Sequence, residues 1–300
     1  MQTERAIHTV KINKAYLKYI ASLLLFGSNG IIASYIALSS YEIVFTRTLI
    51  GSLFLGLVFI LSKQKVQLFL NKSHILYISI SGVAMGASWM FLYEAYARIG
   101  VSIATLAYYC GPVIVMILSP LLFKEKMTSA KLLGFLAVLI GMFFVTGQLS
   151  QESNSFGLIC GILSAVMYAV MVVFNKKAVS ITGLANSMWQ LIMSFITVGI
   201  FLLLKQGFTV NITAESLIPI LILGIVNTGI GCYLYFSSIG DLPVQSVAIC
   251  GYLEPLSALF FSAVLLGEKL TLVQLVGALL ILGGAAFGEL FRQKKLKPIP

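Results

Sequence analysis

The sequence predicts an all-α integral membrane protein of ten transmembrane helices, arranged as two inverted five-helix repeats. Composition is the first reason, because 59% of the 300 residues are hydrophobic and only 10% are charged. A water-soluble domain carries about 25% charged residues, which it needs to cover its surface. With a mean hydropathy of +1.00, this chain has too few polar side chains for that purpose. The composition therefore excludes a soluble enzyme, a disordered chain and a disulfide scaffold.

The individual helices are predicted from continuous apolar runs, each close to the roughly 20 residues that cross a bilayer as a helix. In the first half of the chain the runs cover about 16–38, 42–61, 75–96, 101–123 and 129–146. In the second half they cover about 156–174, 184–204, 216–238, 244–266 and 271–290. A polar stretch at about 147–155 separates the halves. We therefore expect a first repeat over 1–146, a second over 156–290 and a basic cytoplasmic tail over 291–300.

The basic residues predict the orientation, because the cytoplasmic loops of membrane proteins are enriched in Lys and Arg. If the N-terminus is inside, only Arg98, Lys205 and Lys269 lie in outer segments, and Arg47 lies within a run. The inner segments hold all the others: Arg5, Lys11, Lys14, Lys18, Lys63, Lys65, Lys72, Lys124, Lys126, Lys131, Lys176, Lys177, Arg292, Lys294, Lys295 and Lys297. Both termini are therefore expected in the cytoplasm. The net charge of +10 then reflects membrane topology, and we expect no nucleic-acid partner.

An internal repeat is the third reason for the predicted fold. When the sequence is shifted by 143 residues, about 14 of 44 aligned positions are identical between 101–144 and 244–287. The identities include Tyr109 with Tyr252, Pro112 with Pro255, Glu125-Lys126 with Glu268-Lys269, Gly134 with Gly277, and Gly141 with Gly284. Five helices separate equivalent positions, so equivalent helices cross the membrane in opposite directions. Inverted repeats of this kind build secondary transporters, whose substrate site lies near the bilayer midplane between the halves.

The motifs in these segments resemble those of the EamA family of the drug/metabolite transporter superfamily. The resemblance rests on the FGSN motif ending at Asn29, on Arg47, and on the repeated segments CGPVIVMILSPLLFKEKMT and LEPLSALFFSAVLLGEKLT. It covers essentially the whole chain. Phe26 stands where many relatives carry Trp, and Glu254 precedes the second proline where Gly111 precedes the first. The resemblance implies a ten-helix carrier of the bacterial inner membrane, usually an exporter of amino acids or other small metabolites.

Glu254 is the first candidate for a site residue, because a charge in the hydrocarbon core costs about 2.5–3.5 kcal/mol on insertion scales. It lies near the middle of the 244–266 run and is followed by Pro255, which removes a backbone donor and is expected to break the helix. Pro112 is expected to break the equivalent helix. We interpret Glu254 as a proton-coupling carboxylate or as the binder of a substrate amine. The alternative is a buried acid that pairs with a neighbouring helix for structural reasons.

Arg47 is the second ionisable candidate, about six residues inside its apolar run. Its guanidinium has three possible roles: to reach the membrane surface, to pair with Glu94, or to hold a substrate carboxylate. Glu94 and Arg98 are spaced i, i+4, which favours a structural ion pair on one helix face.

Two amides and three aromatic residues complete the predicted site. Asn29 and Asn227 lie within apolar runs, where an amide either contributes to a binding site or joins two helices by hydrogen bonds. Trp89, Tyr109 and Tyr252 also lie near the middle of the membrane. Such aromatic side chains are often simply packed, but we predict that these three line the cavity, where tyrosine offers both an apolar ring and a hydroxyl group.

The sequence contains no catalytic or metal-binding constellation. His8 and His74 lie in polar segments, and the motifs of zinc proteases, nucleophile elbows and ATP-binding loops are absent. We therefore expect neither an enzyme nor a cofactor. The leading hypothesis is a secondary transporter that exports an amino acid or related metabolite by alternating access. It would use a small-molecule substrate, with a proton as the candidate coupling ion, and would work in the bilayer as a monomer or homodimer. The alternatives are an exporter of cationic or aromatic drugs and, more distantly, a lipid-handling or scaffold protein.

Overall fold

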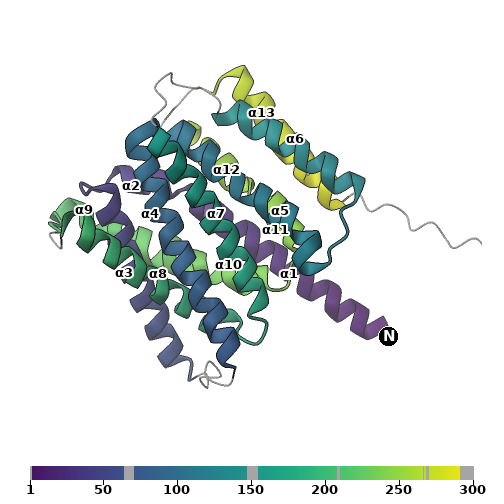
Figure 1. The fold of residues 1–300 in the computed structure, drawn as a ribbon, viewed down its shortest axis with the longest axis horizontal. Coiled ribbons are helices and arrows are strands. Elements are labelled where there is room, and N and C mark those ends of the chain that lie inside the picture. The colour runs from purple at the N-terminus through teal and green to yellow at the C-terminus, as the bar shows by residue number, and fades with distance from the viewer. Residues whose placement is uncertain are drawn as a thin grey trace, which may run out of the picture.

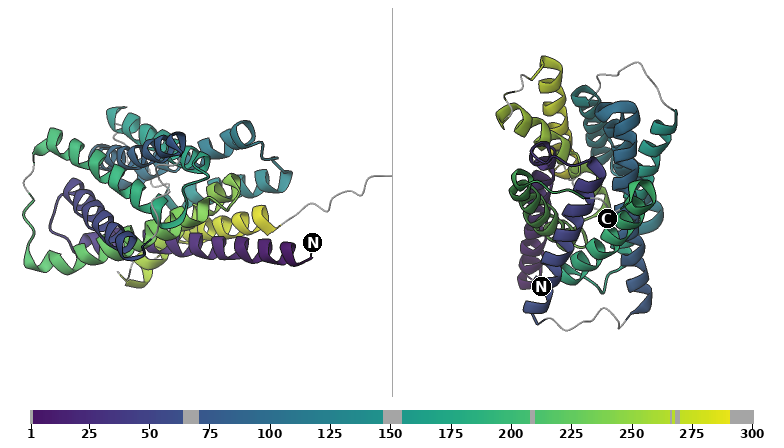
Figure 2. Two further views of the ribbon diagram at one scale, coloured as in Figure 1. Left: turned by 90° about the horizontal axis from the view of Figure 1, so that it is seen from below. Right: turned by 90° about the vertical axis from the view of Figure 1, so that its left-hand side faces the viewer.

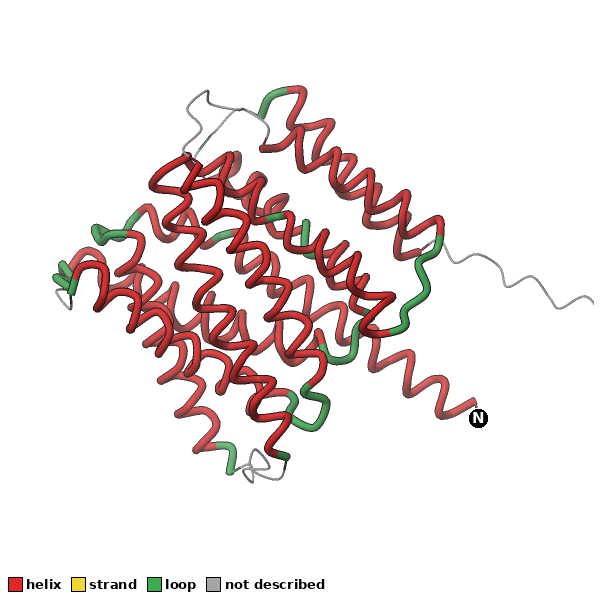
Figure 3. Tube along the Cα trace, viewed as in Figure 1, coloured by secondary structure: helices red, strands yellow, loops and turns green. Residues whose placement is uncertain are grey.

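The computed structural model describes residues 2–63, 71–146, 155–207, 210–265, 267 and 270–290, and each regular element in these ranges is a helix (Figure 3). The predicted tail 291–300, most of the polar stretch 147–155 and the pair Glu268-Lys269 lie outside the described residues. In chain order the elements are α1 (Gln2–Gly27), α2 (Asn29–Ser34), α3 (Ser40–Leu61), α4 (Lys72–Tyr108), α5 (Cys110–Phe123), α6 (Ser129–Thr146), α7 (Ser155–Lys177), α8 (Gly183–Gln206), α9 (Ala214–Leu221), the π-helix η2 (Ile222–Ile230), α10 (Gly231–Ile239), α11 (Val244–Cys250), α12 (Leu253–Leu265) and α13 (Leu272–Leu290).

The helices pack into one bundle (Figure 1), and most are apolar and of membrane-crossing length. In the described part of the chain, eight helical segments are long and apolar enough to cross a membrane: Ile12–Ser34, Ser40–Leu61, Lys72–Ile99, Ile103–Phe123, Ser155–Lys177, Gly183–Lys205, Ala214–Ile239 and Val244–Leu265. Helices α6 and α13 are apolar but shorter. Large apolar side chains such as Leu121 and Leu279 are exposed on the outside, where acyl chains can cover them. The prediction of a helical, multi-pass membrane protein is therefore confirmed.

The helix written as α4 reverses direction near residue 100. Before that point it runs antiparallel to α7, because Ser81 Oγ donates to Met171 O at 2.7 Å and Ser88 Oγ donates to Ser164 O at 2.9 Å. A Cβ placed on Gly161 of α7 would lie 2.7 Å from Ala107 Cβ and 3.9 Å from Ala95 Cβ. In a straight helix those two alanines would be about 18 Å apart. The chain therefore folds back between them, as expected for the separate runs 75–96 and 101–123.

Two helical runs are interrupted close to the repeat-equivalent prolines. The breaks lie at Tyr109, between α4 and α5, and at Gly251–Tyr252, between α11 and α12. Each break precedes its proline by about three residues, so Pro112 and Pro255 occupy the first turn of the helix that follows. The physical reason is that proline has no N–H to donate, and the N–H groups of a first helical turn have no intrahelical acceptor. The prolines thus begin new helices close to where the sequence predicts breaks.

Helices α6 and α13 lie side by side along one edge of the bundle (Figure 1). Their contact depends on glycine, because a Cβ on Gly141 would lie 2.6 Å from Gly277 O and one on Gly284 would lie 2.6 Å from Gly134 O. Close approach of backbones through small residues is the usual way for helices to associate in lipid. The glycines that align in the repeat are therefore found at one helix–helix interface.

We expect Gly284→Ala to destabilise the protein, whereas Gly283→Ala should leave its stability nearly unchanged. The first substitution pushes a methyl group against the backbone of α6, and overpacking of this kind costs about 1–3 kcal/mol. A Cβ on Gly283 meets no atom of the described residues within 4 Å, which makes it a matched control on the same helix. Thermal unfolding of both variants in the same detergent measures the difference. Equal melting temperatures would contradict the close α6–α13 contact.

The two ends of the bundle differ in charge. At one end, here called the basic end, lie the start of α4, the end of α7 and the turns 124–128, 178–182 and 240–243, which together carry Lys72, Lys124, Lys126, Lys176 and Lys177. The N-terminal part of α1 projects from the bundle (Figure 2). At the opposite end the turn before α3 contacts α9, where Ala37 N donates to Ser216 Oγ at 3.0 Å. The two ends of the bundle can therefore be told apart, and the cavity described below opens at the end opposite the basic end.

Candidate functional site

A cavity between the helices has a narrow inner chamber of about 70 Å³. The chamber continues into a wider vestibule of about 1120 Å³. The two spaces share one set of lining residues: Phe26, Asn29, Arg47, Trp89, Tyr108, Tyr109 and Glu254. These side chains come from α1, α2, α3, α4, the α4–α5 break at Tyr109 and α12, and several of these segments are far apart in the sequence. The vestibule extends to Ser39 and Tyr41 at the opposite end of the bundle, so the cavity leads away from the basic end.

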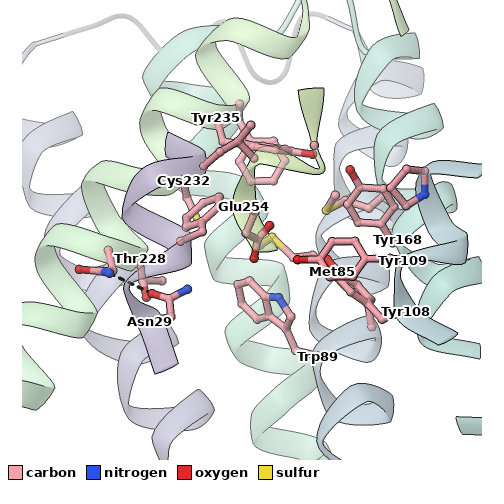
Figure 4. A pocket seen from close by; sticks show the side chains of 18 of the residues that line it. Asn29, Met85, Trp89, Tyr108, Tyr109, Tyr168, Thr228, Cys232, Tyr235 and Glu254 are labelled. Atoms are coloured by element: carbon pink, nitrogen blue, oxygen red, sulfur yellow. Dashed lines mark hydrogen bonds between the residues drawn. The ribbon is translucent and has the colours of Figure 1, made fainter. Parts of the chain in front are cut away.

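Glu254 lies in the middle of this cavity (Figure 4). It is the second residue of α12, and the break at Gly251–Tyr252 brings the first turn of that helix to the chamber wall. No hydrogen-bond donor or ion-pair partner for its carboxylate occurs among the described residues. It is also the only acidic residue among those that line the chamber and vestibule in the described part of the chain. The carboxylate is therefore available to a cation or a proton that enters the cavity.

Arg47 brings a positive charge to the same cavity. Its side chain is buried, with 6% of the residue exposed, and its guanidinium lies over the ring of Trp89, 4.3 Å from the ring centroid. Within the described part of the chain, the buried Nε atom of Arg47 has no hydrogen-bond acceptor. The side chain does not reach the membrane surface. Its flat face is held by the indole, which fixes the direction in which the N–H groups point.

Glu94 is bound by partners other than Arg47. Its carboxylate accepts hydrogen bonds from Lys205 Nζ at 2.9 and 3.0 Å and from Tyr41, and it forms an ion pair with Arg98 at 2.7 Å. The structural i, i+4 pair predicted from the sequence is present, and Lys205 adds a second cation from α8. Of the three roles considered for Arg47, pairing with Glu94 and reaching the surface are therefore wrong. The role that remains is to face the cavity.

The two amides, Asn29 and Asn227, meet at a break in the first apolar run. Asn227 Nδ2 lies 2.7 Å from Leu25 O, 2.8 Å from Ser28 Oγ and 3.0 Å from Asn29 Oδ1. Asn227 belongs to the π-helix η2, and both amides line the chamber. They thus join the interrupted α1–α2 segment to η2. A π-helix often marks a functional site, but nothing in the sequence predicts it.

The three predicted aromatic residues do not share one position. Trp89 and Tyr109 line the chamber, but Tyr252 is fully buried behind it. The Tyr252 hydroxyl donates to Tyr109 O at 2.7 Å, and the two ring centroids lie 5.6 Å apart. The expectation that Tyr252 lines the cavity is therefore wrong. Because the repeat-equivalent tyrosines stack against each other, Tyr109 lies between Tyr252 and the cavity.

Several residues of the chamber were not predicted. They include Phe26, Met85, Tyr108, Tyr168, Cys232 and Tyr235, which come from α1, α4, α7 and α10. Figure 4 shows the tyrosines of α4 and α7 on one side of Glu254 and Asn29 with Thr228 on the other. Each of the six unpredicted residues lies in an apolar run among similar residues. The sequence therefore carries no signal that separates a cavity-facing aromatic side chain from a packed one. Pro112 lines the chamber and Pro255 lines the vestibule.

Comparison with known proteins agrees with this architecture. The EamA-like transporter family matches the chain twice, over residues 13–147 and 155–288. An uncharacterized transporter of Bacillus subtilis, YxxF, is 28% identical over 98% of this chain and 96% of its own length. A probable amino-acid metabolite efflux pump of Salmonella typhimurium is 26% identical over 76% of this chain and 78% of its own length.

A solved crystal structure superimposes with a TM-score of 0.79 at 18% identity, covering 92% of this chain and 97% of the other, and so shares the fold. The two matches to the family, over residues 13–147 and 155–288, cover most of the residues that form the bundle. The chain therefore belongs to the EamA-like transporter family.

Proposed function

We propose that this protein is a secondary transporter that exports an amino acid or a related small polar metabolite by alternating access. The observation that carries the proposal is that Arg47 and Glu254 both line one aromatic cavity. They are the only positively and negatively charged residues that line the chamber and vestibule within the described ranges. An amino acid carries the complementary pair of charges.

The chemistry of the site suits such a substrate. A guanidinium binds a carboxylate through two parallel hydrogen bonds, and Arg47 has an unpartnered Nε and a ring-supported orientation. The carboxylate of Glu254 can accept an ammonium group or a proton. Trp89, Tyr108 and Tyr109 add aromatic faces for an apolar side chain or a cation. The amino-acid metabolite efflux pump named above, at 26% identity, also favours this substrate class.

The proposal includes an architecture of two inverted five-helix repeats, over 1–146 and 156–290. Two observations support it: the family matches the halves separately, and repeat-equivalent segments meet. Tyr109 contacts its equivalent Tyr252, and α6 packs on its equivalent α13 through Gly134 with Gly284 and Gly141 with Gly277. Equivalent segments that face each other are expected when two similar halves surround a central site. We further propose a bacterial inner-membrane location with both termini cytoplasmic, proton coupling, and a monomer or homodimer in the bilayer.

A second candidate function is export of cationic or aromatic drugs. The observation in its favour is the aromatic lining of the chamber around a single carboxylate. Such a site can hold a flat cation through Glu254 and the faces of the aromatic rings. Arg47 separates the two candidates, because a cation-binding site gains nothing from a buried guanidinium that faces the same space.

The experiment that tests the proposal measures substrate flux in proteoliposomes, with a panel of amino acids and organic cations under an imposed pH gradient. For an amino-acid exporter we expect Arg47→Gln to lower amino-acid flux at low substrate concentration by about 10- to 100-fold, because a hydrogen bond to a charged group contributes about 1.5–3 kcal/mol. Arg47→Lys should recover part of the flux, since it restores the charge but not the paired N–H groups.

The matched control is Lys72→Gln, which removes an exposed cation at the start of α4 and should change nothing. Unchanged or increased flux of organic cations in Arg47→Gln, with no amino-acid flux in the wild type, would instead favour the drug exporter. If no member of a broad panel showed gradient-dependent flux, both transport proposals would fail.

A further inference from the structure

The cavity is closed toward the basic end. Its vestibule reaches Ser39 and Tyr41 at the opposite end. The residues between the chamber and the basic end are fully buried; they include Tyr19, Ile239, Val247 and Tyr252. An alternating-access transporter must also open on this closed side. The inference below rests on the proposed function in this respect, and it concerns the side chains that keep the basic end closed.

Lys176 holds the turn between α10 and α11. Its Nζ, at the end of α7, donates to Ile239 O at 3.0 Å, Gly240 O at 3.1 Å and Leu242 O at 2.6 Å. The last carbonyl groups of a helix have no intrahelical donor, so one ammonium group with three N–H donors satisfies the end of α10. This single side chain ties the end of α7 to the α10–α11 turn, and both lie within the second family match.

Glu125 holds the same turn from its other side. Its two carboxylate oxygens accept hydrogen bonds from Val244 N at 2.6 Å and Gln245 N at 3.0 Å, the first two amides of α11. Glu125 lies in the connection between α5 and α6, and in the sequence it belongs to the Glu-Lys pair that the repeat shares. The end of α10 and the start of α11 are therefore fixed by two opposite charges, one from the last turn of α7 and one from the α5–α6 connection.

Helix α11 links this turn to the chamber. All seven of its residues are buried, and it ends at the Gly251–Tyr252 break immediately before Glu254. On its other face Tyr19 of α1 donates from its hydroxyl to Val247 O at 2.8 Å. Movement of the α10–α11 turn would therefore be transmitted along a short rigid segment to the cavity carboxylate.

The side chain of Gln245 makes the closed arrangement less stable than an apolar side chain would. Its residue is fully buried, and neither Oε1 nor Nε2 of its side chain has a hydrogen-bond partner among the residues that the structure describes. A buried polar group without a partner is unfavourable, and water that reached α11 on opening would supply both missing partners. The closed state thus contains a local cost that the interactions of Glu125 and Lys176 must outweigh.

We propose that Glu125 and Lys176 form an inner latch, which keeps the chamber closed toward the basic end by fixing the α10–α11 turn. They act as positioning residues, because neither contacts the cavity where the substrate would bind. When the latch is released, the turn and α11 move away from α1 and α7, the amide of Gln245 becomes hydrated, and the chamber opens at the basic end.

The test uses Cys232, a native thiol that lines the chamber and is 2% exposed. Membrane vesicles of both orientations, sorted with an N-terminal tag, are treated with a charged thiol reagent that does not cross membranes, and mass spectrometry measures modification at Cys232. In the wild type we expect modification from the vestibule side. Glu125→Gln and Lys176→Met should raise modification from the basic side by about tenfold, in line with the loss of a charge-assisted hydrogen bond, and lower it from the vestibule side.

Neighbouring residues provide the controls. Lys177→Met removes the exposed adjacent lysine, and Glu215→Gln removes an exposed carboxylate at the start of α9, so both should match the wild type. Lys176→Arg, which keeps the cation, should restore much of the closure. If Lys176→Met does not fold, Glu125→Gln decides the result by itself.

The latch is disproved if both latch variants label like the controls, or if labelling rises from both sides together, as it would for a generally loosened protein. The assay contains no substrate, so it separates the two proposals. A reciprocal change in labelling with no flux in the panel supports the latch and contradicts the transport function. Flux in the panel with unchanged labelling supports the transport function and contradicts the latch.

Discussion

Replacement of Glu254 by Gln is expected to abolish the dependence of flux on an imposed pH gradient. The amide keeps the size of the carboxyl group but cannot exchange a proton or carry a negative charge. Among the described residues that line the cavity no other carboxylate can take over this role. Flux at low substrate concentration should fall by at least about tenfold, because the hydrogen bond to a substrate ammonium loses its charge. Proteoliposome uptake, measured with and without the gradient, checks the expectation.

Two controls make this result specific to the cavity. Glu215→Gln neutralises an exposed carboxylate far from the site and should retain both rate and gradient dependence. Substrate exchange without a gradient should persist at a reduced rate in Glu254→Gln if the carboxylate serves coupling more than binding. Transport by Glu254→Gln that follows the pH gradient as the wild type does would remove Glu254 from the coupling mechanism.

Gly27→Ala is expected to have the largest effect on stability. A Cβ at this position would collide with Ser257 Oγ and would lie 2.8 Å from Ala258 N and 2.9 Å from Glu254 O. Two of these atoms belong to the backbone of α12, which can yield only if the helix shifts. Overpacking costs about 1–3 kcal/mol, which corresponds to a drop in apparent melting temperature on the order of 5 °C. Because the shift would also displace Glu254, flux should fall together with stability.

Gly30→Ala is the matched control, since a Cβ on Gly30, just beyond the same break, meets no atom within 4 Å in the described ranges. The double variant Gly27→Ala/Ser257→Ala should recover only part of the lost stability, because it removes the hydroxyl but leaves both backbone contacts. Thermal unfolding in one detergent compares all three variants. Equal melting temperatures for Gly27→Ala and Gly30→Ala would show that α1 and α12 are not in this close contact.

Much of the helical architecture could be predicted because a bilayer imposes simple rules. Backbone N–H and C=O groups must be paired within a crossing segment, so a long apolar run such as 42–61 becomes a helix, here α3. The same reasoning located α6, α7, α8 and α13 within a few residues. It did not locate the break at Ser28 or the π-helix, since these depend on contacts between helices rather than on hydropathy. Asn227 holds both irregularities together through three oxygen atoms of the first run.

The candidate site could be predicted only for residues whose chemistry is unusual in a membrane. A carboxylate or guanidinium in an apolar run is costly, and for this reason Glu254 and Arg47 stand out from the sequence. Tyr109 and Tyr252 occupy equivalent positions in the repeat, and only packing decides that Tyr109 lines the chamber while Tyr252 lies behind it. Tyr108 and Tyr168 line the chamber without any sequence signal, because an aromatic side chain is equally compatible with lipid, core or cavity.

The sequence by itself determined that this chain is a helical membrane protein, where most of its apolar helices lie, and which family it resembles. Those properties follow from the cost of placing polar groups in hydrocarbon, which acts on each segment separately. Only the tertiary structure decided that Arg47 lies on Trp89 while Glu94 is bound by Arg98 and Lys205. It likewise decided that Glu125 and Lys176 hold one turn. These contacts join helices distant in sequence, and their partners are chosen by distance and geometry that no single segment contains.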